Sequence, residues 1–206
     1  MALESNILGI VHPALFPGPG NTCSVMRGEG RDAYVLKSIQ WIINDPDFQS
    51  LEITRIKSSS IRREVSTLLN QAKQNHSLRE IVYTAQLVQL INEDNLIDPS
   101  DICSLDENER IKAVLRLQEC IDEACEFPCD KFAFYSGKDP AILQGLSGDA
   151  AERVREEALT QLRRSVHEIC LYIKEKTVPN RPPLLPVLEI FDSRANIPGT
   201  NFSRKP

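Results

Sequence analysis

Short segments rich in β-branched and aromatic residues alternate along this chain with longer segments of helical periodicity, and this alternation constrains the fold most strongly. The expected strands are Ile7–His12, Leu51–Ile56, Glu80–Ala85, Lys131–Ser136 and Leu184–Phe191. The expected helices are Arg31–Asn44, a segment that begins after Ser58–Ser60, Asp106–Glu126, and residues from about 149 to 176. Strands and amphipathic helices in this order predict parallel βαβ units with right-handed crossovers, and therefore an α/β fold.

The local sequence also predicts how the helices begin and which sides they bury. Ser58–Ser60 supply an N-cap for the second helix, and Ser104 is the expected cap of the third. Apolar spacing predicts that the third helix buries Ile111, Val114, Leu115, Ile121 and Ala124. Gly137, directly after the fourth strand, allows a positive φ there.

A chain of 206 residues is expected to form one domain and is slightly short for the roughly 250 residues of a complete (β/α)8 barrel. The element order fits either an open doubly wound sheet or part of a barrel, and periodicity alone does not separate the two. Residues 18–21 read GPGN, which is not the G-x-G-x-x-G turn of a dinucleotide fold. No nucleotide cofactor is therefore expected.

Charge and composition narrow the classes of partner. The net charge is −5 and no long run of Lys or Arg occurs, so neither nucleic acid nor an anionic membrane is an expected partner. The first residues lack the basic start of a signal peptide and no apolar segment approaches about 20 residues, which predicts a soluble, cytoplasmic protein. The six cysteines form no C-x-x-C pair and are expected to be reduced, mostly buried thiols.

Glu189 is the clearest anomaly, because it places a carboxylate inside the otherwise apolar segment LLPVLEIF. Burying an unpaired charge is costly, so something must compensate it. In a barrel, a glutamate near the carboxyl end of a strand can serve as a metal ligand or a general base. The alternative is a structural ion pair with Arg55 or Arg194.

Three further residues are candidates for substrate binding near Glu189. His12 ends the first strand, and Glu52 shares one face of the second strand with Thr54. Lys138 lies in the loop that follows the fourth strand, where barrel enzymes place substrate-binding loops. Two of them also have a structural alternative: His12 as a satisfied residue at a strand end, and the Lys138 loop as an ordinary turn with solvated charges.

Five segments, taken in order, resemble one known family. IVHPALFP, LEITRIK, FAFYSGKDP, the helix REEALTQLRRSVHEICLYIKEK and the strand PVLEIFD are similar to the xylose isomerase-like barrels known as sugar phosphate isomerases/epimerases. The similarity covers roughly residues 7–192, and its best part runs from FYSGKDP to LEIFD. The resemblance implies a partial (β/α)8 TIM barrel of about five parallel strands with four to five helices.

The resemblance also implies a chemistry. In that family a divalent metal, such as Mn, Mg, Co or Zn, holds a sugar or sugar phosphate while carboxylates move a proton beside its carbonyl, with an enediolate as intermediate. Glu189 matches the family glutamate that binds the metal and acts as acid or base. The family's other ligands, an Asp, a His and a Glu, come from later strands, and Asp192 is the sole acid among the 17 residues after Glu189.

Residues 1–192 are therefore expected to form an incomplete barrel domain, and 193–206 a divergent polar tail. This predicts a truncated or spliced product that is inactive alone and prone to associate through its open sheet edges, as a homo-oligomer for example. The alternative function is a noncatalytic α/β interaction protein derived from the same fold. An endonuclease-type relative fits less well, because the chain is acidic and lacks a basic patch.

Overall fold

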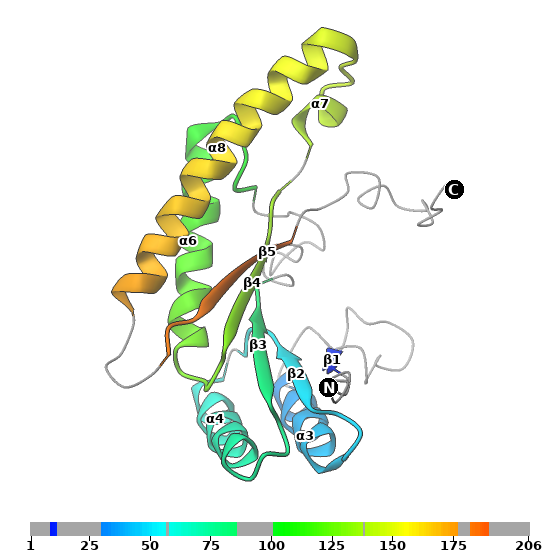
Figure 1. The fold of residues 1–206 in the computed structure, drawn as a ribbon, viewed down its shortest axis with the longest axis vertical. Coiled ribbons are helices and arrows are strands. Elements are labelled where there is room, and N and C mark those ends of the chain that lie inside the picture. The colour runs from blue at the N-terminus through cyan, green and yellow to red at the C-terminus, as the bar shows by residue number, and fades with distance from the viewer. Residues whose placement is uncertain are drawn as a thin grey trace, which may run out of the picture.

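The computed structural model describes residues 9–11, 30–56, 58–85, 101–137, 139–176 and 182–189. Its strands form one five-stranded parallel sheet (Figure 1). They are β1 (Gly9–Val11), β2 (Ser50–Ile53), β3 (Glu80–Thr84), β4 (Lys131–Tyr135) and β5 (Leu185–Glu189). The described helices are α3 (Gly30–Asn44), α4 (Ser59–Gln74), α6 (Glu107–Ala124), α7 (Pro140–Leu143) and α8 (Gly148–Glu175). The predicted α/β fold is confirmed.

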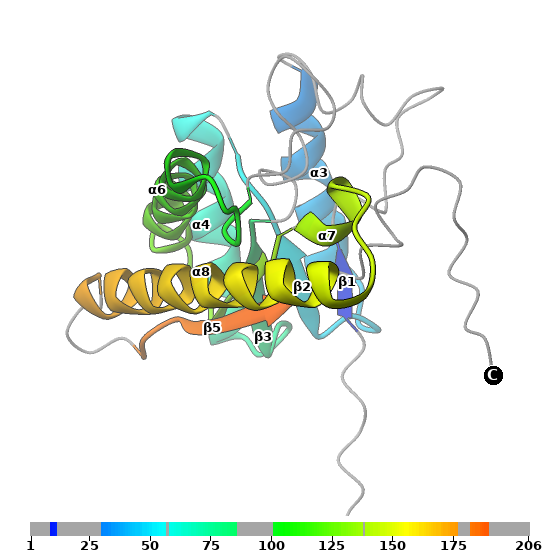
Figure 2. The ribbon, with the colours of Figure 1, turned by 90° about the horizontal axis from the view of Figure 1, so that it is seen from above.

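The strand order decides between the two sheet topologies that the sequence left open. The strands lie side by side in chain order, β1-β2-β3-β4-β5, and every neighbouring pair is parallel. A doubly wound sheet reverses its strand order and carries helices on both faces. Here α3, α4, α6 and α8 all contribute to one core on one face of the sheet (Figure 2). The described strands are therefore wound in one direction only.

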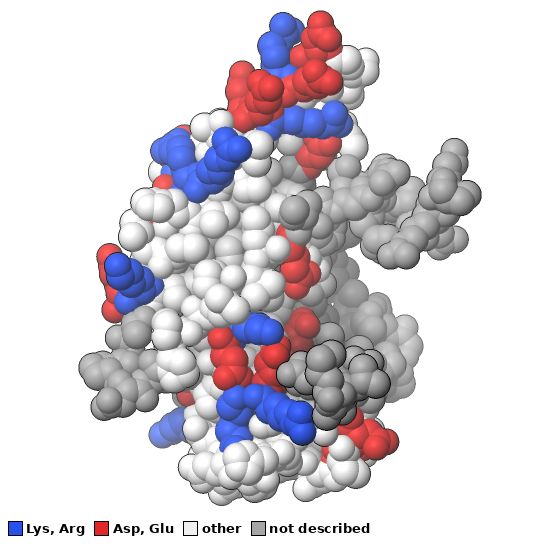
Figure 3. Space-filling model, in the orientation of Figure 1, with Lys and Arg blue, Asp and Glu red and all other residues white. Residues whose placement is uncertain are grey.

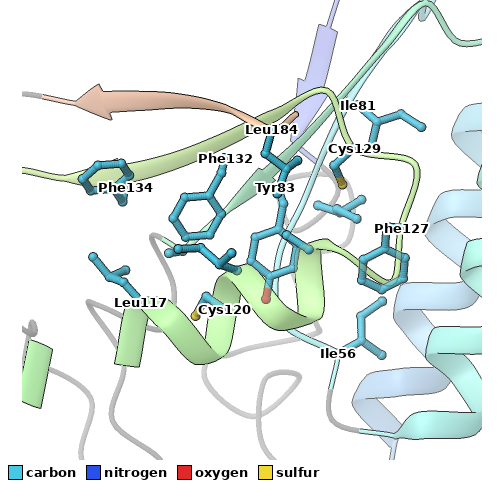
Figure 4. Packing of buried hydrophobic residues seen from close by; sticks show 14 of the residues in the cluster. Ile56, Ile81, Tyr83, Leu117, Cys120, Phe127, Cys129, Phe132, Phe134 and Leu184 are labelled. Atoms are coloured by element: carbon cyan, nitrogen blue, oxygen red, sulfur yellow. The ribbon is translucent and has the colours of Figure 1, made fainter. Parts of the chain in front are cut away.

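The core lies between this sheet face and the helices. Tyr83 stacks on Phe132 with ring centroids 5.9 Å apart, and Phe132 lies 5.7 Å from Phe134 (Figure 4). Phe127, from the turn after α6, completes the aromatic cluster at 6.4 Å from Tyr83. These rings alternate along β3 and β4 with residues of the opposite face, because successive side chains of a strand point to opposite sides.

Helix α4 agrees with its sequence signals. The hydroxyl of Ser58 accepts a hydrogen bond from the Ile61 N–H at 3.4 Å, as expected of an N-cap. Val65, Leu69 and Ala72 recur at helical spacing and are buried against the sheet. The cap and the amphipathic spacing together determine where this helix begins and which side it buries.

Helix α6 corrects two predictions. Asp106, not Ser104, is the N-cap: its carboxylate accepts from the Asn108 N–H at 2.8 Å and the Glu109 N–H at 3.3 Å. Ile111 and Leu115 were expected in the core but are 42% and 54% exposed. The helix turns instead so that Arg110, Ala113, Val114, Leu117, Cys120, Ile121 and Ala124 face inward.

The end of one strand and one short helix also differ from the sequence expectation. Strand β2 ends at Ile53 rather than Ile56, because the Ile56 N–H donates to Glu123 Oε1 at 2.7 Å instead of joining a ladder. A short helix that the sequence analysis did not expect, α7, begins at Pro140. Asp139 caps this helix by accepting from the Ala141 N–H at 2.9 Å.

The described cysteines behave as the sequence predicts. Cys103, Cys120 and Cys129 are buried, Cys125 and Cys170 are half-buried, and all five carry free thiols. Burial raises the pKa of Cys120 to about 12, which keeps this thiol protonated and unreactive at neutral pH. Separately, none of the helices in the described ranges combines the length and apolarity needed to cross a bilayer.

Candidate functional site

The sheet face opposite the helices carries the polar residues of the strands. Because side chains alternate, Glu52 of β2, Thr84 of β3, Tyr135 of β4 and Glu189 of β5 all point to this face. Within the ranges that the structure describes, no helix packs against this face. Val82 of β3, Ala133 of β4, and Leu185 and Val187 of β5 alternate onto the same face, so its polar side chains lie toward the ends of the strands.

These four residues also share one end of the sheet. Thr84, Tyr135 and Glu189 are the last residues of their strands, and Glu52 is the last but one of β2. Tyr135 and Glu189 are register partners on neighbouring strands. In parallel α/β sheets, ligands bind at the carboxyl ends of the strands. We call Glu52, Thr84, Tyr135 and Glu189 the carboxyl-end cluster.

Electrostatics connects the two carboxylates of this cluster. Burial raises the pKa of Glu52, the negative charge of Glu189 raises it further, and the nearby Thr84 hydroxyl lowers it. Burial likewise raises the pKa of Glu189. Each of the two carboxyls therefore holds its proton to a higher pH than an isolated glutamate.

Two hydroxyl groups accompany the carboxylates. Burial, followed by the charges of Glu189 and Glu52, raises the pKa of Tyr135 well above its ordinary value, so the phenol stays protonated at neutral pH. Thr84 Oγ1 is fully buried and makes no hydrogen bond of standard geometry. The cluster thus combines carboxylates, which accept hydrogen bonds, with hydroxyls, which both donate and accept them.

The structural alternative for Glu189 gains no support from the described residues. Of its two expected partners, Arg194 lies outside the described residues, and Arg55 places its charge near Glu123, Tyr83 and Cys120 on the helix side of the sheet. No hydrogen bond or ion pair joins the Glu189 side chain to any residue that the structure describes. At the opposite end of the same face, by contrast, Glu80 is neutralised by Lys131 at 2.8 Å.

The other predicted site residues have different outcomes. Glu52 lies on the same face as Glu189, as expected, whereas His12 and Lys138 lie outside the described residues. In the loop around Lys138, Gly137 has a positive φ of 103°. Asp139 of that loop caps α7 and pairs with Arg155 at 3.0 Å, which is a structural role.

Sequence reasoning missed Thr84 and Tyr135. Every second residue of a strand points to the same face, so Thr84 shares a face with Glu80, and Tyr135 with Lys131. Counting along each strand from Glu80 and from Lys131 would therefore have found them. Their hydroxyl side chains did not stand out, because Thr and Tyr are common in strands. Glu189 stood out because a carboxylate is rare in an otherwise apolar strand.

The donors of the carboxyl-end cluster fit a hard divalent cation in part. Two carboxylates and two hydroxyls provide oxygen ligands, which Mg²⁺ and Mn²⁺ prefer to nitrogen or sulfur. Mg²⁺ sites often use only one or two protein carboxylates, with water or substrate completing the sphere. Within the described part of the chain, however, no three His, Cys, Asp or Glu side chains come together as a metal site.

A separate hollow of about 210 Å³ lies at the start of α6 and beside α7. It is lined by Asp101, Ser104, Leu105, Asp106, Pro140, Leu143 and Gln144. Asp106 uses its carboxylate to cap α6, and Asp101 Oδ1 accepts from the Cys103 N–H and thiol, both at 3.1 Å. Its acidic groups therefore serve the local fold.

The fold and the cluster define a class: an α/β protein with a singly wound parallel sheet and an acidic, hydroxyl-bearing site at the carboxyl ends of its strands. Comparisons give no narrower family, since no family model, curated protein or solved structure matches the chain significantly. The resemblance to sugar phosphate isomerases/epimerases therefore stays a prediction.

The raised pKa values make a prediction about stability. A carboxyl whose pKa is higher in the folded state stabilises the fold below its ordinary pKa of 4.5 and loses that contribution as the pH rises through the folded value. We expect Glu52→Gln and Glu189→Gln each to raise the free energy of unfolding at pH 7 by about 0.5–2 kcal/mol. The gain should disappear below pH 4.5.

Urea unfolding between pH 4 and 8 measures this effect, with Glu64→Gln as the control, because Glu64 is an exposed carboxylate on α4. The control should stay close to wild type at every pH. If both cluster variants were less stable than wild type at pH 7, a cationic partner would be satisfying the carboxylates, and the cluster would be a structural element rather than a site.

Proposed function

We propose that this chain is a sector of a (β/α)8 barrel and that its carboxyl-end cluster is part of a sugar or sugar-phosphate isomerase/epimerase site. Two features of the described residues support the barrel sector: strands that follow one another in chain order, and helices α3, α4, α6 and α8, which lie on one face. In a barrel the opposite face becomes the interior, and the carboxyl ends of the strands form the mouth that binds substrate.

The chemistry of the cluster suits proton transfer beside a carbonyl. Isomerisation of a sugar needs a base that removes a proton from carbon and an acid that returns it to the neighbouring position. Carboxyls with raised pKa values, such as Glu52 and Glu189, exchange protons closer to neutral pH than ordinary glutamates do. Tyr135, which stays protonated, can donate a hydrogen bond to a substrate oxygen.

A divalent metal held by Glu189 and Glu52 would supply the charge that polarises the substrate carbonyl. The single observation that carries this proposal is the convergence of two mutually repelling carboxylates on one face, at the carboxyl ends of the strands. A bound cation or an acid/base cycle would use that repulsion.

The described strands supply only part of such a site. The family that the chain resembles takes its remaining ligands from later strands, and no third acidic or histidine ligand joins the cluster in the described residues. We therefore propose that the chain is inactive alone and that another chain would have to supply further ligands.

A second candidate function, a noncatalytic interaction protein, has its own observation. In Figure 3 a broad area in the middle of the view, where β5 passes beside α8, is white, while charged residues cover the upper part of α8. Leu159 and Leu171 of α8 and Leu185 of β5 are 44%, 46% and 56% exposed. Exposed apolar area of this kind is typical of surfaces that contact other proteins.

Metal binding separates the two candidates. If the cluster is a metal site, titration of the purified chain with Mn²⁺ should show one weak site, and Glu189→Gln and Glu52→Gln should each weaken it by roughly tenfold or more. Glu64→Gln should leave it unchanged. Calorimetry or Mn²⁺ electron paramagnetic resonance measures the affinity. Equal binding by wild type and Glu189→Gln would remove Glu189 from the ligands and favour the interaction protein.

A further inference from the structure

The outer edge of β5 is the last edge of the described sheet. Strand β5 pairs with β4 on one side, and among the described residues no strand pairs with its other side (Figure 1). An unpaired strand edge usually exposes alternating N–H and C=O groups, which another strand can bind. Whether β5 offers these groups depends on which of its residues face outward.

The hydrogen bonds to β4 settle the orientation of each residue. The Leu185 N–H donates to the Asp130 carbonyl at 3.0 Å, and the Ser136 N–H donates to the Glu189 carbonyl at 2.9 Å. In a parallel ladder every second residue directs both backbone groups to the same neighbour. Residues 185, 187 and 189 therefore face β4, and residues 186 and 188 face the outer edge.

Residue 186 is a proline, which has no backbone N–H. Of the two outward positions in β5, only Leu188 can donate a hydrogen bond to an added strand. A strand placed against β5 would leave its carbonyl opposite Pro186 without a donor and pressed against the pyrrolidine ring. Proline in a strand is found where its N–H side faces solvent, which is the position Pro186 occupies.

We infer that the outer edge of β5 is closed to strand addition, so that neither a second copy of this chain nor a strand of another protein extends the sheet there. A partner that covers this side must bind through side-chain contacts, with side-chain donors reaching the Pro186 and Leu188 carbonyls. This inference does not depend on the proposed function. It does constrain that proposal: further ligands supplied by another chain would have to come from a segment that does not pair with β5.

Restoring the missing N–H tests the inference. In Pro186→Val and Pro186→Thr the edge regains its donor, and both residues favour β structure. The matched control is Pro183→Val, which changes an exposed proline just before the strand. Sedimentation velocity over a hundredfold range of concentration should show the wild type and the control with the same mass distribution. Both Pro186 variants should shift toward larger species.

Hydrogen exchange locates the contact. The Leu188 amide should exchange rapidly in wild type and at least tenfold more slowly in the associated Pro186 variants, while core amides such as that of Phe132 stay protected in every protein. Protection of core amides shows that the variants are folded. Slow, concentration-dependent exchange of the Leu188 amide in wild type, or Pro186 variants that associate no more than wild type, would overturn the inference.

Discussion

Gly137→Ala should lower the free energy of unfolding by about 3 kcal/mol, because two independent penalties meet at this position. The backbone φ of Gly137 is +103°, a conformation that residues with a Cβ rarely adopt. An added Cβ would also overlap Asp101 Oδ1 and lie 2.8 Å from Cys103 Sγ. The Cys103 thiol donates a hydrogen bond to Asp101 Oδ1, so neither side chain can move away without losing that hydrogen bond.

The matched control is Gly145→Ala. Gly145 also has a positive φ, of 64°, but an added Cβ would meet no atom within 4 Å. Gly145→Ala should therefore lower the free energy of unfolding only by the cost of backbone strain, about 1 kcal/mol. Denaturant unfolding of the two variants separates strain from overlap. Equal losses in both would mean that the loop after β4 relaxes freely around Gly137, and that its conformation does not depend on Asp101.

Arg110→Ala should cost about 3 kcal/mol, because Arg110 is a buried cation at the junction of α6 and α8. Its guanidinium bonds Glu107 through two contacts of 2.9 Å, Glu168 at 3.1 Å and Ser165 Oγ at 3.0 Å. Ser165 in turn donates to the Ile102 carbonyl at 2.7 Å. Glu107 and Glu168 are 44% and 41% exposed, so water can hydrate them once the guanidinium is removed. Most of the loss in unfolding free energy therefore comes from the lost packing and from the lost hydrogen bond to Ser165.

Lys112→Ala, on the same helix, is the control. Lys112 pairs with Glu109 at 3.1 Å, but both side chains are largely exposed, and such a pair contributes at most about 0.5 kcal/mol. Arg110→Met retains much of the buried volume, so its loss of unfolding free energy should lie between those of Arg110→Ala and Lys112→Ala. A similar effect for Arg110→Ala and Lys112→Ala in urea unfolding would show that the α6–α8 junction does not depend on the buried guanidinium.

Gly137 and Arg110 differ in how much of their structure could be predicted from the sequence. The positive φ of Gly137 was predictable, because glycine after a strand and before Asp-Pro is a local signal. The burial of Arg110 was not. Apolar spacing in α6 pointed to Ile111 and Leu115, and only the partners on α8, more than 50 residues later in the chain, turn the helix to bury Arg110.

Some features of the candidate site could likewise be predicted from the sequence and others could not. Glu189 was predictable because a carboxylate interrupts an apolar strand, and Glu52 because alternation places it on one face. Their mutual repulsion was not, because it depends on how far β2 and β5 lie apart across the sheet. Alternation alone could have placed Thr84 and Tyr135 on that face, and the register of β3, β4 and β5 shows which strand residues they lie beside.

The sequence by itself determined the kinds and order of the elements, the cap of α4, and a carboxylate out of place on β5. These depend on local sterics, helical and strand periodicity, and the cost of burying charge, all of which act within a few residues. Only the tertiary structure decided that the strands follow chain order, that the described helices share one face, and that Pro186 turns its missing N–H to the outer edge. Those features arise from hydrogen bonds and packing between residues far apart in the chain, which no local pattern encodes.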